Sequence, residues 1–162
     1  VGTGVAENMM SGKVHVKGNA SQSAGATAHG GLLIIDGDAS SRCGISMKGV
    51  DIVVKGSVGH MSGFMSQAGN LVVCGDAGEA LGDSLYETNI YIKGKVKSLG
   101  ADCVEKKMDS KHIKKLNSLL KEANIKNQKA VNFKRYGSAK KLYNFKIDNK
   151  TTIKRRINKY NT

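Results

Sequence analysis

The residues of this chain that could do chemistry are its cysteines, its histidines and a few aspartates. Cys43, Cys74 and Cys103 show no paired spacing, so neither a zinc site nor a disulfide framework is indicated. The histidines fall at unrelated positions of the repeat described below: His15, His29, His60 and His112. A stacked set of histidine ligands is therefore not expected.

Two aspartates, Asp38 and Asp76, recur in Gly-Asp-Ala segments, and Asp36 stands close to the first. A pair of carboxylates can serve as a catalytic pair, but aspartate at a turn commonly accepts hydrogen bonds from nearby backbone. We favour the second role and expect these residues to form corners. The nine-residue glycine and aspartate motif of calcium-binding solenoids is missing. We predict no catalytic, cofactor-binding or metal-binding residue in this chain.

The elements that hold these residues are set by a glycine repeat. The first series recurs every nineteen residues: Gly18, Gly37, Gly56, Gly75 and Gly94. A second series follows seven residues later: Gly25, Gly44, Gly63 and Gly82, with Gly100 one residue early in the last copy. A fixed period of this length is the signature of a solenoid.

The residues four and two positions before each glycine of the first series are apolar in all five copies, as Leu33 and Ile35 illustrate. Such alternation is the period of a β-strand. The dozen residues between strands are too few for a helical crossover. The sequence therefore predicts an all-β fold, a right-handed parallel β-helix of about five 19-residue coils. It is followed by a C-terminal capping α-helix and a basic tail.

Both glycine series are expected at the corners of the coils, where the backbone needs positive φ or close approach. Val50 and Thr88 replace a third glycine that other copies carry, and Gly49 is expected to serve the first of these corners. The residues after Val1 already follow the coil register. We therefore expect a chain that begins in mid-coil, with a cap or further coils before it.

Three regions are predicted: the glycine-repeat β-helix (1–105), a capping helix (106–126) and a basic tail with aromatic residues (127–162). Asp109 or Ser110 can cap the helix, whose apolar residues recur at helical spacing. We expect this helix to cover the open end of the β-helix. Four aromatic residues gather in the tail: Phe133, Tyr136, Tyr143 and Phe145. They form either a small core against the coils or an anchor for a partner.

All of the net charge of +13 lies in the C-terminal third. Residues 1–105 hold eight Lys or Arg against ten Asp or Glu, whereas residues 106–162 hold eighteen against three. A basic segment can bind nucleic acid, but here the basic residues are spread evenly among Asn and Ile. We do not predict nucleic-acid binding. No apolar run approaches the length of a membrane span, and three unpaired cysteines favour the cytoplasm.

Three segments carry a resemblance to a known family. They are Gly37-Asp-Ala-Ser-Ser-Arg-Cys-Gly-Ile-Ser-Met-Lys-Gly49, Met61-Ser-Gly-Phe-Met-Ser-Gln-Ala-Gly69 and Cys74-Gly-Asp-Ala-Gly-Glu-Ala-Leu-Gly82. Residues 1 to about 103 resemble the glycine-repeat (GXGXG) β-helix domain at the C-terminus of the glutamate synthase large subunit. Leu99 to Met108 and Arg135 to Phe145 resemble more narrowly the free-standing version of that domain, the β-helix subunit of N-methylglutamate synthase and related complexes.

The resemblance implies a subunit without an active site of its own. In the family, a glutamine-amidotransferase-type part and a glutamate-synthase-type part with FMN and an iron-sulfur cluster carry out the chemistry, and the β-helix spaces them. Both are therefore the expected partners. The alternative within the family is the β-helix subunit of formylmethanofuran dehydrogenase. Alternatives from other classes are a carbohydrate-active β-helix enzyme and a basic nucleic-acid-binding adaptor.

Overall fold

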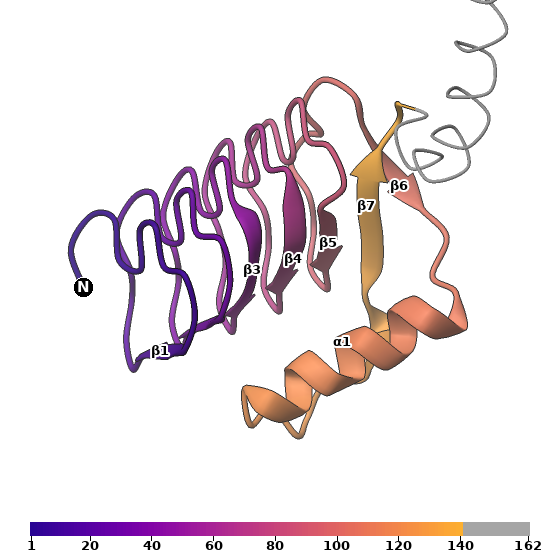
Figure 1. Ribbon diagram of the computed structural model, residues 1–162. Coiled ribbons are helices and arrows are strands. Elements are labelled where there is room, and N and C mark those ends of the chain that lie inside the picture. The colour runs from indigo at the N-terminus through magenta and orange to yellow at the C-terminus, as the bar shows by residue number, and fades with distance from the viewer. Residues whose placement is uncertain (141–162) are drawn as a thin grey trace, which may run out of the picture.

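The computed structural model describes residues 1–140, which form a solenoid with one helix at its side (Figure 1). The elements in chain order are β1 (Lys13–Val16), β2 (Leu32–Ile35), β3 (Lys48–Val54), β4 (Ala68–Val73), β5 (Asn89–Ile92), β6 (Cys103–Lys106), α1 (Ser110–Glu122), a short 3₁₀ helix (Ala130–Asn132) and β7 (Lys134–Ser138). Within this part of the chain, no helix is long and apolar enough to cross a membrane.

Strands β1 to β5 stack in parallel, each displaced by one repeat from the last. Leu33 pairs with Val14 below it and with Ile52 above it. A second ladder of single bridges lies four residues beyond the end of each strand and joins Ala20, Ala39, Val58, Ala77 and Val96. The predicted parallel β-helix is therefore confirmed, with about four turns in the described residues.

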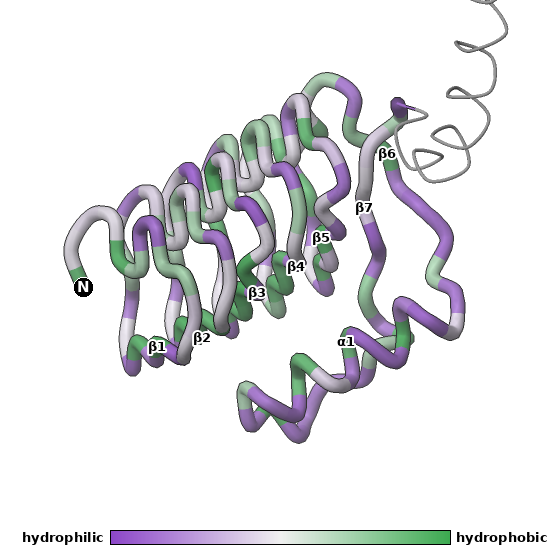
Figure 2. Tube along the Cα trace, viewed as in Figure 1, coloured by the Kyte–Doolittle hydropathy of each residue, from purple (hydrophilic) through white to green (hydrophobic). Residues whose placement is uncertain are grey.

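The core inside the coils consists of the side chains that the alternation predicts to point inward. They are fully buried in the middle of the stack, as at Leu33, Ile52, Leu71 and Ile90, and Val14 in the first coil is partly buried. Figure 2 shows these strands as the apolar stretches of the coils. Small residues of the bridge ladder, such as Ala39 and Ala77, lie in the same core. Burial of this stripe is the main favourable term in the stability of the solenoid.

The two glycine series serve two different needs. In the first series φ stays outside the left-handed region, but a Cβ on Gly56 would lie 2.7 Å from the carbonyl oxygen of Gly37. In the second series φ is positive at Gly25, Gly44, Gly63 and Gly82, although not at Gly100. At Gly44 φ is +72°, and a Cβ there would meet the core side chain of Met47 at 2.9 Å. The first glycine therefore allows close stacking, and the second allows the turn. Gly49 also takes a positive φ, +145°, next to a β-bulge in β3.

Helix α1 lies beside the sheet of β1 to β5 and does not cover the end of the solenoid, contrary to the expectation from sequence (Figure 1). Its buried residues Leu116, Leu119 and Leu120 form a second core with outward-facing side chains of four strands. Those side chains lie three positions before a glycine of the first series: Ile34, Val53, Val72 and Tyr91. The outer face of the sheet is apolar, so the helix is held there.

Strand β7, and not the helix, covers the last coil. It pairs antiparallel with β5 on one edge and with β6 on the other. Tyr136 stands opposite Ile90 and joins the inner core, and Phe133 joins the core under α1. These two aromatic residues are 6% and 3% exposed, so the small-core alternative describes them and they offer no anchor on the surface. Tyr143 and Phe145 lie outside the described residues.

Candidate functional site

The aspartates of the Gly-Asp-Ala segments form corners, as predicted. Asp38 Oδ1 accepts a hydrogen bond from the backbone N–H of Ser57 at 2.7 Å, and Asp76 Oδ1 accepts one from Lys95 at 2.8 Å. Asn19 and Ser57 make the same bond at the same position of their coils. The ladder joins each coil to the next, so these carboxylates have a structural role.

The three cysteines lie apart and are not joined by disulfides. Burial raises the pKa of Cys43 and of Cys103 to about 12 and that of Cys74 to about 11, so all three are neutral thiols at neutral pH. Within residues 1–140, no group of three or more His, Cys, Asp or Glu side chains is placed to hold a metal ion.

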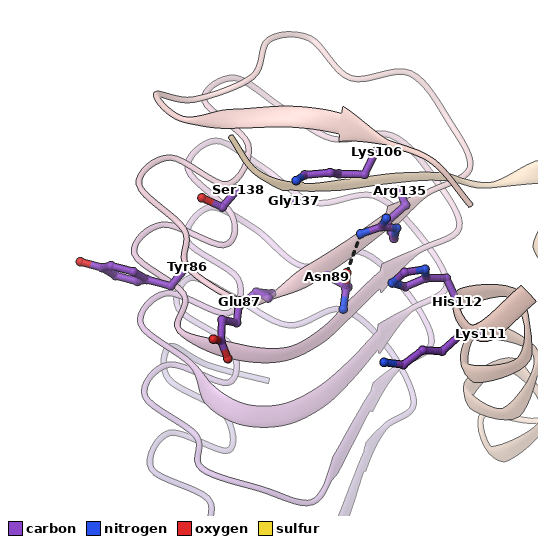
Figure 3. A pocket seen from close by; sticks show the side chains of 10 residues that line it. Tyr86, Glu87, Asn89, Lys106, Lys111, His112, Arg135, Gly137 and Ser138 are labelled. Atoms are coloured by element: carbon purple, nitrogen blue, oxygen red, sulfur yellow. Dashed lines mark hydrogen bonds between the residues drawn. The ribbon is translucent and has the colours of Figure 1, made fainter. Parts of the chain in front are cut away.

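A pocket of about 420 Å³ opens where the last coil, β7 and the start of α1 meet (Figure 3). Because β7 closes the last coil, we refer to β7 as the closing strand. Asn89 of β5 forms its floor, Lys106 of β6 and Arg135 of β7 form one side, and Lys111 of α1 enters from another. Tyr86 lies in the segment before β5, and its side chain points away from the other labelled side chains. We call this cavity the closing-strand pocket.

Arg135 is the central cation of the closing-strand pocket. Its Nη1 donates to Asn89 Oδ1 at 3.0 Å, and its Nε and Nη2 donate to the backbone carbonyl of Lys107 at 3.0 and 2.7 Å. These bonds fix the plane of the guanidinium. Its partners are neutral oxygens, so its charge is not balanced by an ion pair within the described residues.

The start of α1 supplies the other titratable groups. Asp109 is the N-cap residue, and its Oδ1 accepts a hydrogen bond from the backbone N–H of His112 at 3.0 Å. This hydrogen bond lowers the pKa of Asp109 below its usual range. His112 Nδ1 lies 2.6 Å from Asp109 Oδ1. Burial and then the charge of Arg135 lower the pKa of His112. Burial and repulsion by Arg135 likewise lower the pKa of Lys106.

Sequence reasoning missed this pocket, because its residues come from segments that are far apart in the chain. Arg135 and Asn89 are forty-six positions apart and meet only because β7 inserts between β5 and β6. No local spacing encodes that insertion. Strand β7 itself, Lys134–Ser138, begins with two basic residues and contains a glycine, so its sequence does not mark it as a strand.

Comparison with known proteins gives one partial match to report. A segment of 54 residues is 66% identical to Protein GlxC of Rhizobium meliloti (strain 1021). The segment covers 33% of this chain and 24% of that protein. No protein-family model matches the chain, and no solved structure matches it. What the comparison supports is therefore similarity over one third of the chain.

Proposed function

We propose that this chain is a structural subunit of a glutamate-synthase-like complex, of the kind that includes N-methylglutamate synthase. In this proposal it sets the distance between a glutamine-amidotransferase-type subunit and an FMN and iron-sulfur synthase subunit, and it carries no catalytic site of its own. The similarity to Protein GlxC over 54 residues and the GXGXG segments favour this family.

The observation that supports a spacing role is the continuous hydrogen bonding between successive coils. Each coil is joined to the next by strand pairing, by single bridges, and by the corner ladder of Asn19, Asp38, Ser57 and Asp76. A body in which every layer is hydrogen-bonded to its neighbour resists bending. Two subunits bound to its surface would keep a fixed separation, as the transfer of a nitrogen intermediate between two sites requires.

Affinity purification of the full-length protein from its native host tests the proposal. Mass spectrometry should identify an amidotransferase-like chain and a flavoprotein, and the absorption spectrum should show flavin. Assays of that complex with glutamate, glutamine and methylamine then identify the reaction. A protein that emerges alone and colourless at low ionic strength contradicts the proposal.

Of the four aromatic residues expected as possible partner anchors, we propose Tyr143 and Phe145 as docking residues. Replacing both by alanine should reduce recovery of the partner chains, because aromatic side chains commonly dominate the binding energy of an interface. Replacing Asn149 and Asn158 by alanine is the matched control in the same segment and should leave recovery unchanged. Equal recovery with both double variants would rule out this docking role.

A further inference from the structure

The turns that carry the second glycine series separate positive from negative charge along the solenoid. They lie in a row along the edge of the coils away from α1 (Figure 1). Residues 40–49 contain two cations and no acid, whereas residues 78–87, two coils further on, contain three acids and no cation. The cations are Arg42 and Lys48, and the acids are Glu79, Asp83 and Glu87. We call residues 40–49, 59–68 and 78–87 the turn face.

The middle coil of the turn face has no Lys, Arg, Asp or Glu, and it carries apolar side chains at the surface. Met65 is 42% exposed, and Met61 and Phe64 are half-buried. The N–H of Ser46 donates to the carbonyl of Phe64, and the N–H of Met65 donates to that of Asp83, both at 2.8 Å. These bonds place the apolar side chains between the basic and the acidic side. An exposed apolar patch with a polar rim is typical of an interaction site.

The charges of the turn face are mostly left without an ion pair inside the molecule. Within residues 1–140, no ion pair involves Arg42, Lys48 or Asp83. The carboxylate of Asp83 accepts hydrogen bonds from neutral donors only, so it keeps its charge. Glu79 has a partner, since Lys97 lies 3.4 Å away, but both side chains are largely exposed and such a pair contributes little.

The order of these charges makes the turn face complementary to itself. A two-fold axis through Gly63 moves a residue one coil before it to one coil after it and reverses its position in the turn. Arg42, two positions before its glycine, is then placed next to Asp83 of a second copy, one position after its own glycine. Lys48, four positions after its glycine, is placed next to Glu79, three positions before. Both pairings occur twice, as in the interfaces of symmetric dimers.

The apolar middle of the turn face obeys the same symmetry. Met61 and Met65 lie two positions before and two positions after Gly63, so the axis brings Met61 of one copy onto Met65 of the other. Methionine side chains are flexible and pack readily against one another at binding surfaces. The centre of the contact is therefore apolar and its two ends are charged.

We propose that the turn face binds a second copy of this chain, with the two solenoids antiparallel and side by side. A second copy is the fitting partner because the face contains both halves of one complementary set of charges. Three coils stacked about 4.8 Å apart give a contact smaller than the usual interface of about 800 Å² per partner. The dimer is therefore weak, with a Kd of about 10–100 µM. This inference does not depend on the proposed subunit role.

Sedimentation velocity of the full-length protein over a range of concentrations tests the proposal. At about 0.15 M salt, charges more than roughly 8 Å apart are largely screened, which limits repulsion by the basic C-terminal third. A monomer–dimer equilibrium is expected. A protein that stays monomeric up to about 0.5 mM, well above the expected Kd, overturns the proposal.

Met65→Ser tests the apolar centre. Ser46 and Ser84 occupy the same position of the neighbouring turns with the same left-handed φ, so the variant should keep the fold. Its dimer should dissociate about tenfold more readily, because apolar contact is lost in both copies. Val131→Ser is the matched control, since Val131 is 69% exposed and lies outside the turn face. Equal effects of the two substitutions would contradict the proposed surface.

A charge exchange tests the two-fold arrangement. Lys48→Glu alone and Glu79→Lys alone should each weaken the dimer about tenfold, because like charges then meet at both symmetric contacts. The double variant has the original net charge of +13 and should recover the affinity. A double variant as weak as the single ones would overturn the antiparallel arrangement. Protection of Met65 from oxidation by a different protein chain, without self-association, would assign the face to that partner and overturn the proposal as well.

Discussion

At the scale of single residues, the two glycine series can be separated by experiment. A Cβ on Gly56 would lie 2.7 and 2.8 Å from backbone atoms of Gly37, whereas a Cβ on Gly18 would have nothing within 4 Å. Gly56→Ala should therefore lower the free energy of unfolding by about 1–3 kcal/mol or more. Gly18→Ala should change it by less than about 0.5 kcal/mol. Urea unfolding followed by circular dichroism compares them, and equal effects would contradict the close-stacking role.

The corner ladder gives a second prediction at this scale. Asp38→Ala removes the acceptor for the backbone N–H of Ser57 and should cost about 0.5–1.5 kcal/mol of unfolding free energy. Asp38→Asn keeps an acceptor oxygen, like that of Asn19 one coil earlier, so its free energy of unfolding should be close to that of the unchanged protein. The same unfolding experiment measures both. If the Asn variant were as unstable as the Ala variant, the negative charge and not the hydrogen bond would be what matters.

At the scale of elements, the start of α1 should make stability depend on pH. His112 faces Arg135 of β7 and lies beside Asp109 and Lys111 of its own helix, and its pKa in the folded state is lowered. The folded protein therefore takes up this proton less readily than the unfolded chain. The contribution of His112 to stability is fully present above its ordinary pKa of about 6.5, and it is lost as the pH falls through the lowered value.

The free energy of unfolding should consequently fall between about pH 7 and pH 5. His112→Gln should reduce that fall, because the variant lacks the His112 ring, while the other three histidines are unchanged. Asp109 acts in the same direction but in the more acidic range, since its lowered pKa belongs to a carboxyl group. Urea unfolding at several pH values compares the two proteins. Parallel curves for the variant and the unchanged protein would show that His112 does not contribute.

The sequence predicts the features that depend on residues close together in the chain. The inward-facing strand residues and the glycine positions of the coils could be predicted, because each is determined within one coil. The place of α1 was not, since helical periodicity shows an apolar face but not what covers it. A signal was present in the outward positions, where Ile34, Val53, Val72 and Tyr91 are apolar although they point away from the coils. An apolar outer face requires a second layer.

The turns also contain left-handed residues other than glycine, which the sequence does not mark. Around Gly25, Gly44, Gly63 and Gly82, the positions two before and two after the glycine are also left-handed, as at Arg42 (φ 58°) and Ser46 (φ 51°) around Gly44. Side chains of several types occupy these positions, so no pattern marks them. The middle position differs because its Cβ would enter the core, where Met47 and Ile52 already lie. Glycine is thus retained where packing and φ both demand it.

At the scale of the whole molecule, β7 ends the series of parallel strands, and β6 beyond it forms the edge of the sheet. The last parallel strand, β5, would otherwise present an open edge of N–H and C=O groups, which favours pairing with another chain. The antiparallel direction of β7 breaks the parallel pairing of the coils, and β6 then pairs with the free edge of β7. The pocket and the termination of the solenoid thus depend on the same strand.

Tyr136→Ala tests this dependence. The side chain is 6% exposed and packs in the inner core opposite Ile90, so its loss should cost about 3–5 kcal/mol and loosen β7 from β5. The exposed edge should then cause association that increases with protein concentration, measured by light scattering after gel filtration. Circular dichroism must show that the strands remain. Lys134→Ala, on the same strand but exposed, should stay at the original size. A folded and unassociated Tyr136→Ala protein would mean that the coils end without help from β7.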